Sequence, residues 1–197
     1  QVIVFAGDSL LSFDPKSGEQ YWKYDWKTSY SCNIATPIVR GNFVFISSGY
    51  GKGCATLEIS KDKKTEKPRV DRLFYNWRMK NHFSTSVFYK DHIFGFNEAY
   101  LTCIEMKNGT VNPKKAGERR WKTGKVDKGS LILAQGHLII YTEKGELWLV
   151  EASPEEFRPK ANFMVNEGRK RWSLPVLANG RLYVRADDKL YCFNMRK

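Results

Sequence analysis

The sequence is poor in the residues and motifs on which most enzyme sites are built. It has three histidines, His82, His92 and His137, and four cysteines, none of them adjacent to another. It contains no HExxH, no paired Cys-x-x-Cys, no glycine-rich phosphate loop and no Gly-x-Ser-x-Gly. No apolar run approaches the ~20 residues of a membrane-spanning helix. These absences disfavour the corresponding hydrolases, metalloenzymes and nucleotide-binding enzymes, and an enzyme is the minority hypothesis.

What the sequence does contain is a tandem repeat, which bears on architecture more directly than composition does. One short strand-like segment, mostly apolar and ending in Asp, Glu or Asn, recurs five times at intervals of 43 to 47 residues. The five copies are Leu10–Asp14, Cys54–Glu58, Leu101–Glu105, Leu147–Glu151 and Leu190–Asn194. A second apolar run precedes each copy, so each unit contains at least one hairpin.

Two further strands complete the unit. Four of the units have a leading strand, and its turn carries residues that tolerate positive φ, as in Lys90-Asp91 and Asn179-Gly180. A fourth strand is expected to end on a recurring tryptophan, represented by Trp22, Trp77, Trp121 and Trp172. Each unit is therefore predicted to be a four-stranded antiparallel sheet.

Sheets that repeat every 40–50 residues usually pack radially around an axis, as the blades of a β-propeller. The prediction is an all-β chain forming a single domain, 1–197, with three complete and two partial blades. The blade segments are 1–27, 28–78, 79–122, 123–172 and 173–197. The four tryptophans are expected to dock between neighbouring blades, with an aromatic ligand cage as the alternative. The incomplete first and fifth units suggest part of a seven- or eight-bladed ring; a closed five-sheet ring or pairing of two copies stays open.

Phe13–Trp22 runs from a strand through Asp, a short turn and Gly to a tryptophan. This pattern resembles the pyrroloquinoline-quinone-type (PQQ-like) propeller repeat, and Thr36–Phe45 and Pro175–Val184 are similar to its other half. The resemblance implies a ring of eight blades in most members. It also implies one of two branches, quinone-dependent dehydrogenases or non-catalytic propellers similar to the lipoprotein scaffold of the outer-membrane assembly machine.

The residues favour the non-catalytic branch. The dehydrogenase branch implies an adjacent-cysteine disulfide against the quinone and a calcium held by oxygen ligands, and neither pattern occurs in this sequence. We therefore expect no catalytic, cofactor-binding or metal-binding residues, and a scaffold for protein–protein interaction. Two alternatives stay open: a fragment of a PQQ- and calcium-dependent dehydrogenase whose site lies in other blades, and a sensor propeller joined to another domain. The resemblance implies a periplasmic or otherwise extracytoplasmic location.

The cysteines bear weakly on the compartment. Cys103 and Cys192 occupy the same position of the repeat and are expected to be buried thiols. Cys32 and Cys54 belong to one unit, and whether they form a disulfide is left open by the sequence.

Charge is the feature with the clearest bearing on partners, because the net charge is +12. Basic residues cluster in the loops that join third and fourth strands, and these loops are expected to form one basic face. The predicted contact residues are Lys63, Lys64, Arg69, Lys114, Lys115 and Arg169, with Tyr50 and Phe157 as aromatic anchors. An acidic protein is the favoured partner and anionic lipid headgroups are an alternative. Nucleic acid is disfavoured because no aromatic–basic recognition motif accompanies the charge. The alternative to any binding role is a set of long solvated loops.

Overall fold

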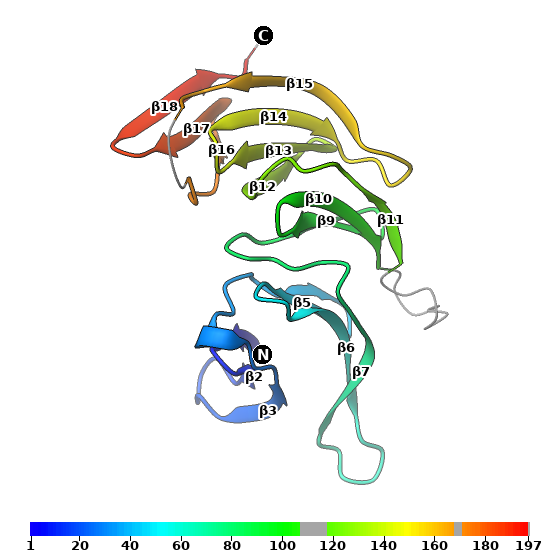
Figure 1. Ribbon diagram of the computed structural model, residues 1–197. Coiled ribbons are helices and arrows are strands. Elements are labelled where there is room, and N and C mark those ends of the chain that lie inside the picture. The colour runs from blue at the N-terminus through cyan, green and yellow to red at the C-terminus, as the bar shows by residue number, and fades with distance from the viewer. Residues whose placement is uncertain (107–117, 168–170, 197) are drawn as a thin grey trace.

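The computed structural model describes residues 1–106, 118–167 and 171–196. These residues form five antiparallel sheets that follow one another along an arc from the N-terminus to the C-terminus (Figure 1). The prediction of an all-β, propeller-like chain is confirmed. In the described part, no helix has the length and apolar character that crossing a membrane requires.

The first sheet contains β1 (Val2–Phe5), β2 (Ser9–Phe13) and β3 (Gln20–Asp25). The second contains β4 (Ile38–Arg40), β5 (Phe43–Ser48), β6 (Gly53–Lys61) and β7 (Pro68–Asn76). The third contains β8 (Val87–Tyr89), β9 (His92–Asn97), β10 (Tyr100–Glu105) and β11 (Arg119–Lys122). The fourth contains β12 (Gly129–Ala134), β13 (His137–Thr142), β14 (Glu146–Glu151) and β15 (Arg158–Met164). The fifth contains β16 (Val176–Ala178), β17 (Arg181–Ala186) and β18 (Lys189–Asn194), and a short 3-10 turn, η1 (Ser29–Ser31), precedes the second. Each sheet lies within its expected segment.

The hairpin turns adopt the backbone that their residues indicated. Lys90 and Asp91 have φ of 46° and 60°, and Asn179 and Gly180 have φ of 50° and 70°. Positive φ at both central residues is typical of a type I′ turn, whose twist matches that of the flanking strands. The same geometry brings His92 and His137 to the first positions of β9 and β13. Each ring lies against a turn carbonyl, with Nδ1 2.6 Å from Lys90 O and 3.0 Å from Gln135 O, respectively.

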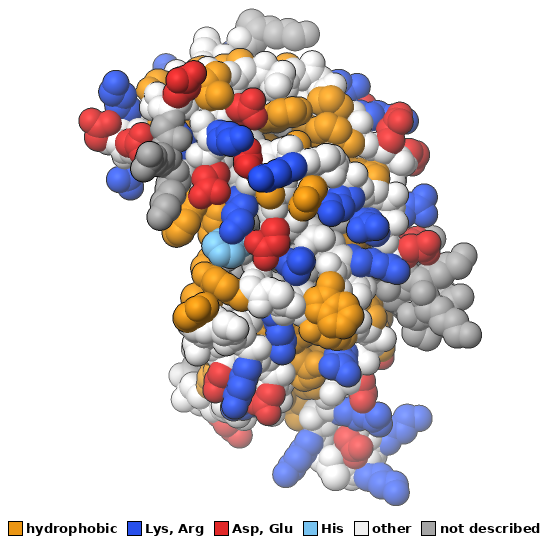
Figure 2. Space-filling view, in the orientation of Figure 1, with side chains coloured by type: hydrophobic (Ala, Val, Ile, Leu, Met, Phe, Trp, Pro, Cys, Tyr) orange, Lys and Arg blue, Asp and Glu red, His pale blue; other side chains and the backbone are white. Residues whose placement is uncertain are grey.

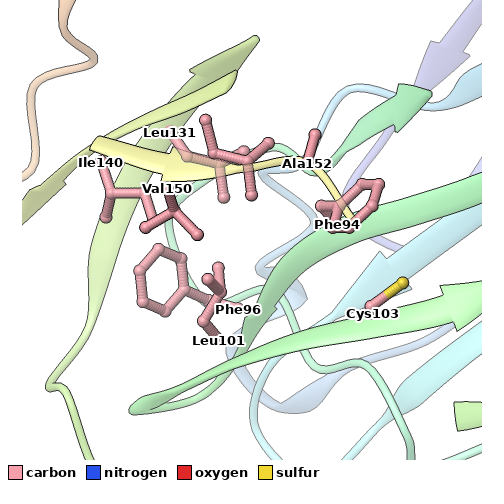
Figure 3. Packing of buried hydrophobic residues seen from close by; sticks show 9 residues of the cluster. Phe94, Phe96, Leu101, Cys103, Leu131, Ile140, Val150 and Ala152 are labelled. Atoms are coloured by element: carbon pink, nitrogen blue, oxygen red, sulfur yellow. The ribbon is translucent and has the colours of Figure 1, made fainter. Parts of the chain in front are cut away.

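Packing between consecutive sheets forms the core. In β13, Leu138 and Ile140 pack toward the third sheet, while Ile139 and Tyr141 pack toward the fifth. Side chains alternate between the two faces of a strand, so a strand enclosed between two sheets is apolar at nearly every position. Figure 3 shows the packing between the third and fourth sheets, where Phe94, Phe96 and Leu101 meet Ile140 and Val150.

A β-bulge recurs at the same place in the first four sheets, in the pairing with the outermost strand: β2 with β3, β6 with β7, β10 with β11 and β14 with β15. The pairing shifts directly after Ser12↔Trp22, Thr56↔Phe74, Cys103↔Trp121 and Leu149↔Ala161. The strand residues skipped by the bulge are Tyr21, Leu73, Arg120 and Lys160. Bulges re-aim the neighbouring side chains, so this register defines one equivalent position, which we call the docking position: Trp22, Phe74, Trp121 and Ala161.

Trp22 and Trp121 therefore dock between sheets as expected, within the cores shared with the second and the fourth sheet. The same expectation is wrong for Trp77 and Trp172. Both lie outside the strands, and their side chains are 62% and 49% exposed. The structural equivalents are Phe74 and Ala161, because the bulge register, rather than the spacing between tryptophans, decides which residue meets the next sheet.

The expectation for the cysteines is half correct. Cys103 is fully buried between the third and fourth sheets, whereas Cys192 is exposed, on a face of the fifth sheet that no other sheet of the described residues covers. Cys32 and Cys54 are free thiols with different partners: Sγ of Cys32 bonds to Tyr30 O and Sγ of Cys54 to Asn76 Oδ1.

The docking position is expected to contribute strongly to the stability of the folded chain. Trp22→Ala removes a side chain that is 6% exposed and leaves a cavity between two sheets, so we expect a loss of about 3–5 kcal/mol in the free energy of unfolding. Trp77→Ala is the matched control, with an expected change within about 0.5 kcal/mol. Denaturant titration of both variants measures the difference, and equal losses would contradict this assignment.

Candidate functional site

Two opposite sides of the arc carry the connections. One side, on the left of Figure 1, holds the links between sheets and the turns between second and third strands; we call it the connection face. The other side holds the turns between first and second strands and the loops between third and fourth strands; we call it the hairpin face.

The connection face carries a continuous row of aromatic rings. Tyr30 and Tyr50 meet with ring centroids 5.5 Å apart, and Tyr50 lies 4.9 Å from the His82 ring. His82 and its neighbour Phe83 both contact Trp172, and the Phe83 and Trp172 rings are stacked at 5.1 Å with an interplanar angle of 21°. We call these five residues, Tyr30, Tyr50, His82, Phe83 and Trp172, the aromatic row.

The aromatic row combines exposure with distant sequence origins. Its rings come from the link before the second sheet, the β5–β6 turn, the link before the third sheet and the link before the fifth. Tyr30 is 83% exposed and Tyr50 41% exposed, although rings of this size usually contribute to cores. Figure 2 shows hydrophobic side chains gathered along this left edge of the molecule.

Hydrogen bonds from two asparagines hold the links that carry the row. Asn33 donates from Nδ2 to the carbonyls of Ala6, Gly7 and Trp26 at 2.8–3.1 Å and accepts at Oδ1 from the Ser48 hydroxyl. The Trp26 indole N–H donates to the same hydroxyl.

Asn81 does the same for the link that carries His82 and Phe83. Its backbone N–H donates to Ser47 Oγ, its Nδ2 donates to Phe96 O, and its Oδ1 accepts from Ser86 Oγ, at 3.0–3.2 Å. Because Ser47, Ser48 and Phe96 lie on strands and the other partners lie within two residues of a strand end, both links are held against the sheets.

Backbone geometry and charge also shape the row. Tyr30 and Tyr50 have φ of 67° and 53°, which is uncommon for residues with a Cβ, and both side chains are exposed. Burial lowers the pKa of His82, and the charge of Lys128 lowers it further. In the described part of the chain, His82 Nδ1 has no hydrogen-bond partner.

Trp172 is anchored at the far end of the row. Its indole N–H donates to Glu143 Oε1 at 3.1 Å. The preceding Arg171 side chain is fully buried, with Nη2 3.5 Å from Asp187 Oδ2. Arg171 therefore belongs to the connection face and is not part of an exposed basic surface.

The basic residues of the second unit lie on the opposite, hairpin face. β6 and β7 form a long hairpin that projects beyond the other sheets, and Figure 2 shows Lys and Arg side chains gathered at its tip. Lys63 and Lys64 are exposed in the turn. Arg69 lies on β7 rather than in the loop, and its guanidinium makes a two-pronged ion pair with Asp71 at 2.8 and 2.9 Å.

The turn of this basic hairpin has the same hydrogen bonds as the Asp14 turn of the first sheet. Asp14 Oδ1 accepts from the N–H groups of Lys16 and Ser17, and Asp62 Oδ1 accepts from those of Lys64 and Thr65. The Tyr21 hydroxyl and these N–H groups lower the pKa of Asp14 to about 2. The N–H groups of Thr65 and Lys64 likewise lower the pKa of Asp62.

Several predicted contact residues receive no structural description. Lys114, Lys115 and Arg169 lie outside the described residues. Phe157 is not an exposed anchor, because it packs against Trp121 and Trp148 in the core between the third and fourth sheets. Tyr50 is exposed as expected, but it lies in the β5–β6 turn, at the opposite end of β6 from Lys63. Lys63, Lys64 and Arg69 all belong to the β6–β7 hairpin on the hairpin face, and the single basic face that would join them to Lys114, Lys115 and Arg169 stays a prediction.

The sequence pattern did not predict Tyr30, His82 and Phe83 as contact residues. Their place in the repeat could have indicated them, because each is an aromatic or imidazole residue in a link between an outermost strand and the next sheet. Within residues 1–106, 118–167 and 171–196, no group of three or more His, Cys, Asp or Glu side chains could hold a metal ion.

Comparisons with solved structures show the fold. BamB from Moraxella catarrhalis matches with a TM-score of 0.60 at 15% identity, covering 98% of this chain and 57% of that one. Hsv2 from Kluyveromyces lactis matches at 0.59 and 8% identity, covering 96% and 56%. A 6-phosphogluconolactonase-like protein from Bacteroides uniformis matches at 0.62 and 13% identity, covering 98% and 63%. The chain thus spans less than two thirds of the length of these structures. No protein-family model matches, and no curated protein matches.

His82 makes the stability of the connection face depend on pH. Its pKa in the folded chain lies below the ordinary value of 6.5, so the unfolded chain binds the proton first as the pH falls. We expect wild type to lose more stability between about pH 7 and 5 than His82→Gln. Thermal melting of both proteins across this range provides the measurement, and parallel pH curves would contradict the expectation.

Proposed function

We propose that this chain is a non-catalytic β-propeller scaffold that binds a protein partner through the aromatic row of its connection face. The observation that carries the proposal is the exposure of this row on links that hydrogen bonds pre-order. Tyrosine and tryptophan are enriched among the residues that dominate binding energy at protein interfaces. Because the row is already ordered, a partner would bind it without a large entropic cost of ordering loops.

The finer family assignment is also a proposal. The Asp14 turn, followed by the docking Trp22, supports membership of the PQQ-like propeller repeat. The low-identity match to BamB is compatible with the non-catalytic branch, and membership of that branch would imply an extracytoplasmic location.

The basic β6–β7 hairpin is a second candidate contact surface, on the other side of the arc. Lys63 and Lys64 project from a turn that Asp62 fixes, and the chain carries a net charge of +12. A positive tip of this kind speeds encounter with an acidic protein more than it adds to final affinity.

Paired variants test the aromatic row. Tyr30→Ala combined with Trp172→Ala should weaken retention of a protein partner from an extract of the source organism by about 30-fold or more, as loss of an interface hot spot does. Tyr21→Ala removes the same kind of ring from the hairpin face and should leave retention close to wild type. If all three proteins capture the same material equally, the aromatic row is not the binding surface.

Charge reversal tests the hairpin separately. Lys63→Glu with Lys64→Glu should slow association with the captured partner by about tenfold at low salt, while the melting temperature stays near that of wild type. Lys16→Glu is the matched control, because Lys16 occupies in the Asp14 turn the place that Lys64 occupies in the Asp62 turn. Surface plasmon resonance at two salt concentrations measures both rates, and a salt-independent, unchanged rate would exclude a steering role for this hairpin.

A further inference from the structure

A polar cavity lies on the connection face, beside the link that leads into the fifth sheet. Its volume is about 280 Å³, and in the described part of the chain it is lined by Arg171, Trp172, Ser173, Arg185 and Asp187. The first three residues belong to the link before β16, and the other two lie at the end of β17 or directly after it. Because β17 pairs with β16 on one side and with β18 on the other, the cavity is built on a central strand.

Arg171 is the unusual member of this lining. Its side chain is fully buried, yet within the described residues its Nε, Nη1 and Nη2 atoms have no hydrogen-bond partner. Its ion pair joins Nη2 to Asp187 Oδ2 at 3.5 Å, and the Asp187 side chain is 53% exposed. Taking a guanidinium out of water is costly unless its five N–H groups are bonded. A buried polar group left without partners therefore calls for a functional explanation.

The equivalent position before the second sheet shows a fully bonded side chain. Asn33 lies five residues before the first residue of β4, as Arg171 lies five residues before that of β16. The Asn33 amide donates to three carbonyls and accepts from the Ser48 hydroxyl. At Arg171 the chain instead has a longer, charged side chain, packed against Gly145, where a Cβ would lie 3.3 Å from Arg171 Cζ. The substitution thus brings a positive charge and unbonded donors to this link.

The charge and shape of the cavity favour a carboxylate. Arg171 Nη2 reaches Asp187 on the cavity wall, and Arg185, whose Nε donates to Asp187 O at 3.2 Å, adds a second guanidinium. The described lining therefore has a net charge of +1, which matches a singly charged anion. A guanidinium presents its N–H groups in a planar fork that pairs with the two oxygens of a carboxylate. Trp172 adds an aromatic wall against which an apolar group can pack.

We propose that this cavity binds the carboxylate of an organic acid, with Arg171 and Arg185 as its charged contacts. Because Arg171 already contacts the half-exposed Asp187, binding would exchange the Asp187 carboxylate for that of the ligand. The acid can be a free molecule or an acidic side chain of a polypeptide, since both present the same group. The cavity adjoins the aromatic row at Trp172, but a free acid would bind it without the protein partner proposed for that row, so either proposal can fail without the other.

The test measures binding to the full chain at pH 7, in a buffer free of carboxylates and phosphate. The probes are phenylacetate, its uncharged analogue phenylacetamide, inorganic phosphate, and the peptide N-acetyl-Ala-Glu-Ala-amide with its Gln counterpart. Isothermal titration calorimetry gives the affinities, and the Trp172 indole N–H signal of ¹⁵N-tryptophan-labelled protein locates the site. We expect a carboxylate probe to shift this signal saturably and to bind at least about tenfold more tightly than its uncharged counterpart. The tighter of the two carboxylate probes identifies the source, a free acid or an acidic side chain.

Asp187→Asn is the most informative variant, because it removes the competing carboxylate. Asp187 has φ of 55°, a conformation that asparagine also adopts, so the turn should be preserved. We expect the carboxylate probes to bind this variant about tenfold more tightly than wild type. Asp188→Asn makes the same change of charge at the neighbouring residue, which does not line the cavity, and should leave the affinity within about twofold of wild type.

Neutral replacements test the two arginines. Arg171→Met should weaken carboxylate binding by at least about tenfold while the melting temperature holds or rises, because replacing a buried charge by an apolar side chain is often neutral or stabilising. Arg185→Gln should weaken binding by about threefold or more. Arg181→Gln changes another exposed arginine of β17, outside the cavity, and should leave binding unchanged. If Arg171→Met does not fold, Asp187→Asn and Arg185→Gln decide.

Three results would overturn the proposal. Absence of saturable binding by both carboxylate probes, or equal affinity for each probe and its uncharged counterpart, would show that the cavity takes no carboxylate. Tighter binding of phosphate than of either carboxylate would assign the cavity to another anion. An affinity that Asp187→Asn and Arg185→Gln leave unchanged would place the binding elsewhere on the chain.

Discussion

Apolar packing between consecutive sheets is the interaction on which the rest of this structure depends. A second strand such as β13 buries side chains on both faces, so it is stable only when a sheet lies on each side. The same requirement explains the fifth sheet, where β17 buries Leu182 and Val184 against the fourth sheet and exposes Arg181 and Arg185 on its other face. The arc in Figure 1 is the arrangement that gives each central sheet two neighbours.

A recurring backbone feature decides which side chain closes each junction. The bulge between third and fourth strands places one residue against the next sheet, and the chain uses tryptophan, phenylalanine, tryptophan and alanine at the four places. The backbone geometry is thus repeated while the side chain at the docking position varies. Where that side chain is aromatic it packs in the core of the junction, and where it is the small Ala161 a pocket lies between the sheets.

The two faces of the arc differ because the connections on one face join different sheets and those on the other join strands of the same sheet. Links on the connection face must cross from one sheet to the next, and side chains such as Asn33 and Asn81 tie them to neighbouring strands. Rings such as Tyr30 on these links are thereby held in exposed positions. Turns on the hairpin face stay within one sheet, so a turn such as that of Asp62 can carry Lys63 and Lys64 outward without disturbing the core.

The sequence by itself determined the repeat, the sheets and most turns, because strand alternation and positive-φ residues such as Asn179-Gly180 act locally. The recurrence of tryptophan pointed to Trp22 and Trp121 as residues that close junctions, but it pointed equally to the exposed Trp77 and Trp172. Only the tertiary structure decided that Phe74 and Ala161 share their position while Trp77 and Trp172 do not, because one skipped residue at a bulge changes the side chain that faces the next sheet. It alone assembled the aromatic row, whose rings lie as far apart in sequence as Tyr30 and Trp172 and meet only when four sheets pack side by side.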